Sequence, residues 1–495
     1  MNAAHYDAVV IGSGFGGSLV GHALVQAGLK TALLERGQWA KRDAADWDQR
    51  TILLQKRYRS ASPLLVKQYG RRTFQRTYPN EVVGGNSVFF GGASLRLRPA
   101  DFARWPLSYA DLAPYYARAE QLLGVHGEAG TDPYEPPGLT AYPHATVELS
   151  APAQRIYQAG TALGLRPFKI PLAINFSDRT RPLCLRCITC DGFPCKVEAK
   201  NDMASTLLAA ASAAGLEIIV GAVAQRLVQR NGRVEQVEYV DSTSRQAHAL
   251  STDLVVLAAG ALNSPALMLR SGFDHPLIGR FLMRHCNGIA NCIFPFRTNP
   301  QQVFHKQLCF SDFYEDLRAE LGTAVGVIQD IYTPAPPIIR HHAPWGFKTL
   351  VGLLTGYMQN LLCIAEDEPS RDNRVSLSDE QDVFGMELVQ VEHAYSAADC
   401  RRRDYLLAKA ETVLRQAGGL LRYRYLIDSF SHAIGTLRCA TAPEEGVLNV
   451  DCRYWGSENL YVSDGSFMPS SGGVNPSLTI AANALRVAER ILSKR

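Results

Sequence analysis

The chain has 495 residues, more than a single hydrophobic core usually covers, so two structural domains are expected. With 46% hydrophobic and 20% charged residues, its composition is that of an ordinary globular protein. The 51 basic residues nearly balance the 47 acidic ones, giving a formal net charge of +4. So small an excess argues against nucleic acid as a partner.

The beginning of the chain and its most apolar segment bear on location. The first residues contain no cationic stretch ahead of a long apolar core, so no signal peptide is visible and a cytoplasmic location is expected. The most apolar segment, residues 347–364, is interrupted by Lys348, Tyr357 and Gln359. It is therefore predicted to be a buried helix or a lid helix, and no membrane span is expected.

The first forty residues have the pattern of a dinucleotide-binding unit. Residues 6–11 are a short, β-branched apolar run that suits a buried parallel strand, and residues 18–27 have helical character. A glycine-rich turn, residues 12–17, lies between them, and a second apolar run, residues 30–34, ends at Glu35. Strand, glycine turn, helix, strand and acidic residue in this order predict a Rossmann-like unit.

Each residue of this pattern has a chemical reason. Gly12 permits a tight turn, Gly14 lets the backbone approach a pyrophosphate, and Gly17 lets the helix pack close to the strand. The amino end of the helix offers free N–H groups and partial positive charge to the phosphates. Glu35 can accept hydrogen bonds from both ribose hydroxyls. The unit alone leaves open whether the dinucleotide is FAD or NAD.

Later segments resemble the signatures of the glucose–methanol–choline oxidoreductases, in the order and spacing of that family. They are the glycine-rich loop 82–92, the segment 105–116, the strand and turn 257–265, the segment 279–285, and the C-terminal blocks 459–466 and 472–480. The resemblance implies an α/β fold with a Rossmann-like FAD-binding domain. It also implies a discontinuous α+β substrate domain built on an antiparallel sheet.

The resemblance further implies how the chain divides between these domains. The FAD-binding domain is expected to comprise residues 1–45, 80–100, 196–285 and 430–495. The substrate domain is expected to comprise residues 46–79, 101–195 and 286–429, with a cysteine-rich loop at 184–195. Within it, residues 294–366 and 381–425 match the family only loosely, and the proline-rich stretch 332–337, with Arg340, His341 and His342 after it, is predicted to be a loop.

The residues expected to contact FAD follow from the same resemblance. They are Gly12, Gly14, Phe15, Gly17, Glu35, Gly84, Gly85, Ser87, Gly91, Gly92, Val223, Ala259, Gly260, Asp464, Gly465, Asn475 and Pro476. Paired glycines in the loop suit backbone that passes close to a flat ligand. A helix is predicted to begin at about Pro476, with its positive end near the flavin. Some members of the family attach FAD through a histidine in this loop; Phe89 and Phe90 stand there, so non-covalent FAD is expected.

Two further residues are expected to carry the chemistry. A flavin that oxidises an alcohol takes a hydride from carbon, so the protein must supply a base for the hydroxyl proton. By resemblance, His432 matches the active-site histidine of the family. Asn475 matches the second residue of the pair, which in some members is also a histidine. We expect His432 to act as the base and Asn475 to hold the alcohol oxygen.

The resemblance leaves the substrate open among three classes. A sugar or polyol is the first expectation, because the blocks look most like the sugar-oxidising branches with a His/Asn pair. A sterol or long-chain alcohol is the alternative, since sterol oxidases also carry this pair. The family also includes non-oxidising lyases and flavoproteins that only bind. The electron acceptor, which is oxygen, a quinone or a redox protein, stays open.

Four of the eleven cysteines are clustered: Cys184, Cys187, Cys190 and Cys195. Their spacing resembles an iron–sulfur loop of the ferredoxin type, and some bacterial FAD sugar dehydrogenases of the family carry a cluster at about this point in the chain. Four thiolates would equally suffice for zinc. The third possibility is a loop with disulfides or with packed, reduced thiols, although stable disulfides are disfavoured in the cytosol. The sequence leaves these three possibilities open.

Overall fold

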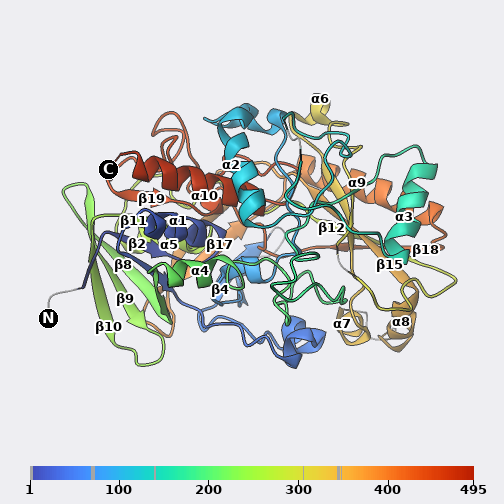
Figure 1. The fold of residues 1–495 in the computed structure, drawn as a ribbon, viewed down its shortest axis with the longest axis horizontal. Helices are drawn as coiled ribbons and strands as arrows, with labels where there is room; N and C mark the ends of the chain where they lie inside the picture. The colour runs from blue at the N-terminus through green and yellow to red at the C-terminus, as the bar shows by residue number, and fades with distance from the viewer. Residues whose placement is uncertain are drawn as a thin grey trace.

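The computed structural model describes residues 4–68, 73–138, 141–304, 306–342, 346 and 348–494. Among these residues the strands form four sheets. A parallel sheet with its covering helices lies at one end of the molecule, together with both chain termini, and an antiparallel sheet lies at the other end (Figure 1). This arrangement confirms the predicted α/β class.

The parallel sheet has the strand order β19-β11-β2-β3-β7. Its members are β2 (Ala8–Ile11), β3 (Thr31–Glu35), β7 (Glu217–Val220), β11 (Val255–Leu257) and β19 (Leu460–Val462), and all neighbours run parallel. The helices α1 (Phe15–Gln26) and α10 (Ser477–Leu492) pack against each other beside it (Figure 1). Strands covered in this way are apolar throughout, as β2 is.

A second sheet, of order β1-β10-β9-β8, adjoins the N-terminus. It contains β1 (Ala4–Tyr6), β8 (Ala222–Arg230), β9 (Arg233–Asp241) and β10 (Ala247–Thr252). The run 6–11, predicted as one strand, is therefore divided between two sheets. The chain bends at Asp7, because the amides of Asp7 and Ala8 both donate to the carbonyl of Lys30, at 2.9 and 3.3 Å.

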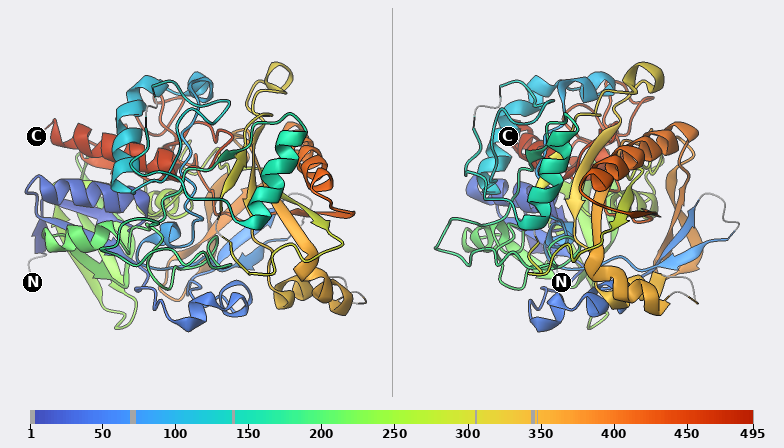
Figure 2. Two further views of the ribbon diagram at one scale, coloured as in Figure 1. Left: turned by 45° about the vertical axis from the view of Figure 1, so that its right-hand side comes forward. Right: turned by 90° about the vertical axis from the view of Figure 1, so that its right-hand side faces the viewer.

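The antiparallel sheet has the order β18-β12-β15-β14-β13-β6. Its strands are β6 (Phe168–Lys169), β12 (Gly288–Ile293), β13 (Leu308–Phe310), β14 (Gly326–Ile331), β15 (Met358–Ala365) and β18 (Leu421–Leu426). The helices α3 (Ala151–Ala162) and α9 (Ala397–Gln416) lie side by side near it (Figure 2), and α9 packs on β12 and β15. The predicted antiparallel sheet is present.

The remaining elements connect these layers. The fourth sheet has the order β16-β17-β4-β5, with β4 (Leu64–Gln68), β5 (Gln75–Thr77), β16 (Arg374–Gln381) and β17 (Glu387–His393). The other helices are α2 (Tyr109–Leu122), α4 (Leu207–Ala213), α5 (Asn263–Arg270) and the one-turn α6 (Arg318–Leu321). Short helical turns are η1 (Ala44–Trp47), η2 (Arg50–Leu54), η3 (Gly85–Val88), η4 (Pro99–Arg104) and η6 (Gly465–Phe467). None of the helices within the described ranges has both the length and the apolar character needed to cross a bilayer.

Two secondary-structure predictions between residues 332 and 364 were right only in part. The apolar segment 347–364, predicted as a helix, begins outside the described residues at 347 and continues as α8 (Lys348–Leu354), η5 (Thr355–Tyr357) and the buried strand β15. A strand covered on both faces is apolar throughout, so its periodicity cannot be told from that of a buried helix. The proline-rich stretch, predicted as a loop, leads into the helix α7 (Pro336–His342), since proline is well tolerated in the first turn of a helix.

Candidate active site

The segment that leads from β2 into α1 has no room for a Cβ atom at three glycines, and at Gly16 this atom would lie 2.3 Å from the carbonyl oxygen of Ser463. Gly12 has a φ of +104°, and a Cβ atom there would overlap the carbonyl oxygen of Ala258. A Cβ on Gly17 would overlap the carbonyl oxygen of Gly12. Gly14 differs, because a Cβ there would meet nothing within 4 Å. This glycine is the N-cap of α1 and has no side chain to cap the first amides of the helix, which leaves them available to a pyrophosphate.

Glu35 ends β3 and is only 6% exposed. Its carboxylate accepts hydrogen bonds from the amides of Ser13, at 3.1 Å, and Gly37, at 2.7 Å. Glu35 pairs in register with Val220, and Val223 follows three residues later at the start of β8. The acidic residue and Val223 therefore lie at one edge of the parallel sheet, beside the glycine turn.

The glycine-rich loop packs against this turn. The Gly84 amide donates to Ser13 Oγ at 2.7 Å, and a Cβ on Gly85 would lie 3.2 Å from the Gly14 Cα. Ser87 Oγ accepts from the Met203 amide at 3.0 Å. Further along the loop lie Gly91 and Gly92, where added Cβ atoms would lie 2.9 Å from Asp191 Cγ and 2.8 Å from Ile174 Cγ1. The loop thus passes so close to its neighbours that side chains at these glycines would collide with them.

The C-terminal block completes this group. Asp464, directly after β19, accepts hydrogen bonds from the Gly260 amide at 2.9 Å and from Ser264 Oγ at 2.5 Å. Gly260 follows Ala259 at the end of β11, and Gly465 accepts from the Gly435 amide at 3.0 Å. In the described part of the chain, the buried Ser463 hydroxyl has no hydrogen-bond partner. Uncapped helix amides, close glycine backbone and an unsatisfied hydroxyl together fit the pyrophosphate of FAD.

His432 makes its key contact with a second histidine, His285. Their Nδ1 atoms lie 3.1 Å apart, and the rings meet edge to face with centroids 5.1 Å apart. His285 is 1% exposed, and its Nε2 lies 2.9 Å from the carbonyl oxygen of Gly472. Burial lowers the pKa of His432 to about 3, with a further lowering from His285, and burial also lowers the pKa of His285. Both imidazoles are therefore neutral at neutral pH.

These contacts determine which nitrogen of each ring carries the proton. A carbonyl can only accept, so His285 Nε2 must donate to Gly472. A neutral His285 then has a lone pair on Nδ1, which accepts the Nδ1 proton of His432. His432 is left with its lone pair on Nε2. The pair thus leaves one specific nitrogen of His432, Nε2, free to accept a proton.

His285 is held firmly by its own neighbours. Its backbone has a φ of +58°, its amide donates to the buried Asp367 at 3.0 Å, and its carbonyl accepts from the Tyr395 hydroxyl at 2.8 Å. No role for this histidine was predicted from the sequence. The available signal was its place at the end of the family-like segment 279–285.

Asn475 lies two residues before α10, in the same loop as Gly472. Its Oδ1 accepts from Gln329 Nε2 at 2.7 Å, and Gln329 is fully buried in β14. Nearby, the Gly473 amide donates to the Tyr314 hydroxyl at 3.0 Å. Sequence reasoning also missed Gln329 and Tyr314, because they lie in the segment that matches the family only loosely. The loop that holds Asn475 is thus tied to His285 on one side and to the antiparallel sheet on the other.

The four clustered cysteines line a single cavity together with Ile174, Lys200 and Phe304. All four are free thiols, and burial raises the pKa of Cys184 to about 12. Their loop is connected to the glycine-rich loop 82–92, called the flavin loop below, because the Gly192 amide donates to the Phe89 carbonyl at 2.7 Å. Among the described residues, no three of these sulfurs lie within 4.8 Å of one another. Tetrahedral zinc with Zn–S bonds of about 2.3 Å would need sulfurs about 3.8 Å apart.

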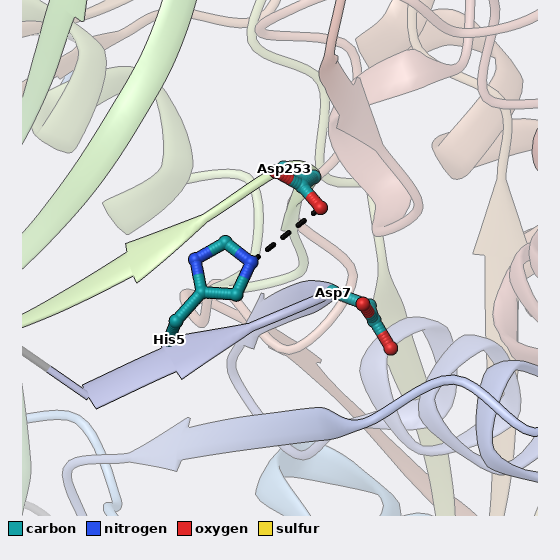
Figure 3. A group of neighbouring side chains, drawn as sticks. All are labelled: His5, Asp7 and Asp253. Carbon is teal, nitrogen blue, oxygen red and sulfur yellow. Dashed lines mark ion pairs between the residues drawn. The ribbon is translucent and has the colours of Figure 1, made fainter.

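One other group of side chains has metal-ligand atoms in close proximity, namely His5, Asp7 and Asp253 (Figure 3). His5 Nε2 and Asp253 Oδ2 lie 3.5 Å apart, and Asp7 accepts from the Lys30 amide at 2.7 Å. His5 lies within β1 and Asp253 directly follows β10, and both are exposed. Exposed charged groups of this kind are common, and no function is assigned to this one.

Comparison with known proteins agrees with this geometry. Two family models described as GMC oxidoreductase match residues 6–287 and 369–484. The chain is 31% identical to 6'''-hydroxyparomomycin C oxidase of Streptomyces lividus, over 99% of this chain and 91% of that protein. It is 32% identical to paromamine 6'-oxidase of Streptomyces fradiae, over 98% and 91%. A 2-methyl-1,2-propanediol dehydrogenase of Mycolicibacterium austroafricanum is 26% identical over 99% and 96%.

The fold is shared with solved structures. A pyridoxine 4-oxidase from Mesorbium loti superposes with a TM-score of 0.72 at 20% identity, covering 98% of this chain and 99% of that one. The family models span most of the chain, and relatives above 30% identity extend over nearly all of it. The protein therefore belongs to the GMC oxidoreductase family and is an FAD-dependent enzyme that oxidises alcohol groups.

Proposed function

We propose that the protein oxidises a hydroxyl group of a sugar or polyol to a carbonyl, with His432 as the base. The observation that carries this proposal is the hydrogen-bonded histidine pair, in which His432 is neutral and has its lone pair on Nε2. FAD, when bound, supplies the acceptor for the hydride that leaves the carbon atom. The residues that we propose to hold it are the seventeen named in the sequence analysis.

The side chains of this site have distinct roles in the proposal. His432 Nε2 takes the hydroxyl proton, and Asn475 hydrogen-bonds the same oxygen. His285 is a positioning residue, since it acts through His432 by holding its tautomer and its ring orientation. The carbonyl of Gly472 completes the chain by holding His285.

The relatives support a polyhydroxylated substrate. Two are named as oxidases of paromamine and of 6'''-hydroxyparomomycin C, and a third as a dehydrogenase of a propanediol. The alternative of a sterol or long-chain alcohol drew on the apolar segment 347–364 as a pocket lining. Residues 358–364 of that segment belong to the buried strand β15, which weakens this support. A lyase or a flavoprotein that only binds has no specific observation in its favour.

We propose that FAD is bound without a covalent link. Phe89 packs against Tyr58 and Phe90 against Phe15, with ring centroids 6.1 and 5.2 Å apart. Neither phenylalanine offers a nucleophile to the flavin. Acid precipitation should release the yellow colour into the supernatant, and colour retained in the pellet would contradict this proposal.

We propose further that Cys184, Cys187, Cys190 and Cys195 hold an iron–sulfur cluster. Their shared cavity, their connection to the flavin loop and sulfurs spread too widely for zinc support a multinuclear cluster. Such a cluster would carry single electrons away from the flavin. It would make the enzyme a dehydrogenase, with a quinone or a redox protein as acceptor rather than oxygen.

Two broader expectations stay proposals. The domain division at 1–45, 80–100, 196–285 and 430–495 against the remainder is one. A cytoplasmic location is the other, supported by the seven cysteines outside the proposed cluster, which are free thiols, as a reducing compartment would keep them.

The experiment that tests the proposed function is anaerobic reduction of the bound flavin, followed by absorbance. The substrates are a panel of aminosugars, neutral sugars, diols and hydrophobic alcohols. Rapid reduction by the sugars or diols, lost in His432→Ala, is the expected result. Reduction only by hydrophobic alcohols would favour the alternative substrate class, and an unchanged rate in His432→Ala would remove the base assignment.

A further inference from the structure

A network of buried and half-buried polar side chains leads from the cysteine-rich loop to Asn475. Lys306 Nζ lies 2.9 Å from Asp191 Oδ2 and donates to Gln329 Oε1 at 3.1 Å. Gln329 Nε2 in turn donates to Asn475 Oδ1 at 2.7 Å. Lys306 is 1% exposed and Gln329 is fully buried. These hydrogen bonds and the ion pair therefore join the cysteine-rich loop, the antiparallel sheet and the loop that contains Asn475.

Because Lys306 can only donate hydrogen bonds, it determines which group donates and which accepts throughout this network. An ammonium group has three donors and no acceptor, so only the oxygen of Gln329 can face it. The NH2 group of Gln329 must therefore donate to Asn475, and Asn475 must accept through its Oδ1 atom. A primary amide has nearly the same shape in both orientations, so sterics alone would not select one. The positive charge of Lys306 therefore selects the orientation of both amides.

Asp191 makes the buried ammonium possible. Burying an unpaired charge is costly, and the carboxylate provides the compensating charge. Asp191 lies against the flavin loop, since a Cβ on Gly91 would be 2.9 Å from its Cγ. The Gly192 amide, on the next residue, holds this part of the loop to Phe89. The ion pair is thus fixed between the cysteine-rich loop and the flavin loop.

We propose that Asp191, Lys306 and Gln329 form a positioning relay that turns Asn475 so that its Nδ2–H group faces the substrate oxygen. The proposal rests on the proposed role of Asn475. Among the described residues, Asn475 Nδ2 donates no hydrogen bond, which leaves this donor for a ligand. When His432 removes the hydroxyl proton, the substrate oxygen gains negative charge. An N–H donor stabilises that charge, whereas an amide oxygen in its place would repel it.

The test is a double-mutant cycle measured by anaerobic flavin reduction with the best substrate of the panel. Its variants are Lys306→Met, Asn475→Ala and their combination. Loss of one preorganised donor to a developing oxyanion typically costs about 100-fold or more. We therefore expect Lys306→Met to slow reduction about 10- to 100-fold, mainly in kcat. In the Asn475→Ala background we expect it to add less than about twofold, because no amide is left to turn.

The matched control is Lys169→Met, which removes a lysine from the neighbouring strand β6 of the same sheet, where it donates to Thr146. We expect this variant to reduce its flavin at the wild-type rate. Losses from Lys306→Met and Asn475→Ala that multiply would overturn the relay, since Lys306 would then act independently of Asn475. A wild-type rate in Asn475→Ala alone would instead overturn the proposed role of Asn475.

A second variant covers the case in which Lys306→Met fails to fold. Gln329→Glu keeps the side-chain shape and still accepts from Lys306, but its ionised carboxylate cannot donate to Asn475. We expect the same 10- to 100-fold loss, which again disappears in the Asn475→Ala background. The loss should also be recovered in part by Asn475→His, because an imidazole can present a donor without the help of Gln329. An unchanged rate in Gln329→Glu would overturn the relay.

Discussion

His285 and His432 share one hydrogen bond between their Nδ1 atoms, 3.1 Å apart, and this bond determines which nitrogen of His432 can act as a base. The proton positions follow from a backbone carbonyl, that of Gly472, which can only accept. The protein therefore sets the tautomer before any substrate arrives. This relationship leads directly to the first prediction.

Replacing His285 should damage catalysis without removing the flavin. In His285→Ala, His432 loses the acceptor for its Nδ1 proton and can rotate or change tautomer, so we expect flavin reduction to slow about 10- to 100-fold. In His285→Gln, the side-chain oxygen can replace the lost acceptor and should recover part of the rate. Stopped-flow absorbance measures both, with the flavin spectrum as the check on binding. Equal rates for the alanine and glutamine variants would show that the hydrogen bond has no part in catalysis.

The pKa of His432 predicts how folding stability depends on pH. The folded protein holds this pKa at about 3, whereas the unfolded chain has the ordinary value of about 6.5. Below pH 6.5 the unfolded state therefore binds more protons, so stability is complete above that value and falls as the pH drops toward 3. We expect His432→Gln to lose less stability than the wild type between pH 6.5 and 4.5. Urea unfolding across this range tests it, and parallel curves would contradict it.

Two glycines of the first turn should respond differently to alanine. Gly17→Ala places a Cβ into the Gly12 carbonyl and should destabilise the fold itself. Gly14→Ala meets open space, so the apoprotein should keep its melting temperature while FAD binding weakens, because the methyl group occupies the approach of the pyrophosphate. Thermal unfolding and FAD titration of both apoproteins measure this. Normal FAD affinity in Gly14→Ala would contradict the placement of the pyrophosphate.

The clustered cysteines can be tested with a matched pair of variants. If they hold an iron–sulfur cluster, the purified protein should contain iron and show broad absorption beneath the flavin bands. Both should fall sharply in Cys187→Ser. Cys400→Ser, at a cysteine outside the cluster, should change neither. Iron analysis and anaerobic spectra provide the measurement, and iron-free wild-type protein prepared anaerobically would rule the cluster out.

The sequence predicted well those features that depend on backbone geometry. The family, FAD dependence, the α/β class and the helix after Pro476 are confirmed, because glycines such as Gly12 and Gly17 are required by close backbone contacts that few sequences satisfy. The roles of His432 and Asn475 stay predictions. Their neighbourhood in the structure nevertheless shows what the motifs could not convey, namely the partners that orient them.

Other features could not be read from the sequence. Gln329 and Lys306 are distant in sequence from Asn475. The pairing of β13 with β14 brings Lys306 close to Gln329, and a side-chain hydrogen bond joins Gln329 to Asn475. The strand β15 was mistaken for a helix, because burial on both faces removes the alternation that marks a strand. The bend at Asp7 depends on two amides sharing the Lys30 carbonyl, which is a contact between neighbouring strands.

The order of strands in the parallel sheet has a consequence for how the protein matures. Among the strands of this sheet, β2 is synthesised first. On one side its neighbours in the sheet are β11 and then β19, and β19 is synthesised some 450 residues later. Until residues 460–492 emerge, α1 lacks its partner α10, and the turn lacks Asp464. Part of the apolar core therefore stays exposed to solvent while the nascent chain is being synthesised. Contacts between residues this distant in sequence also form slowly. Cofactor capture should accordingly follow completion of translation, and the cell's chaperones should be needed most during that interval.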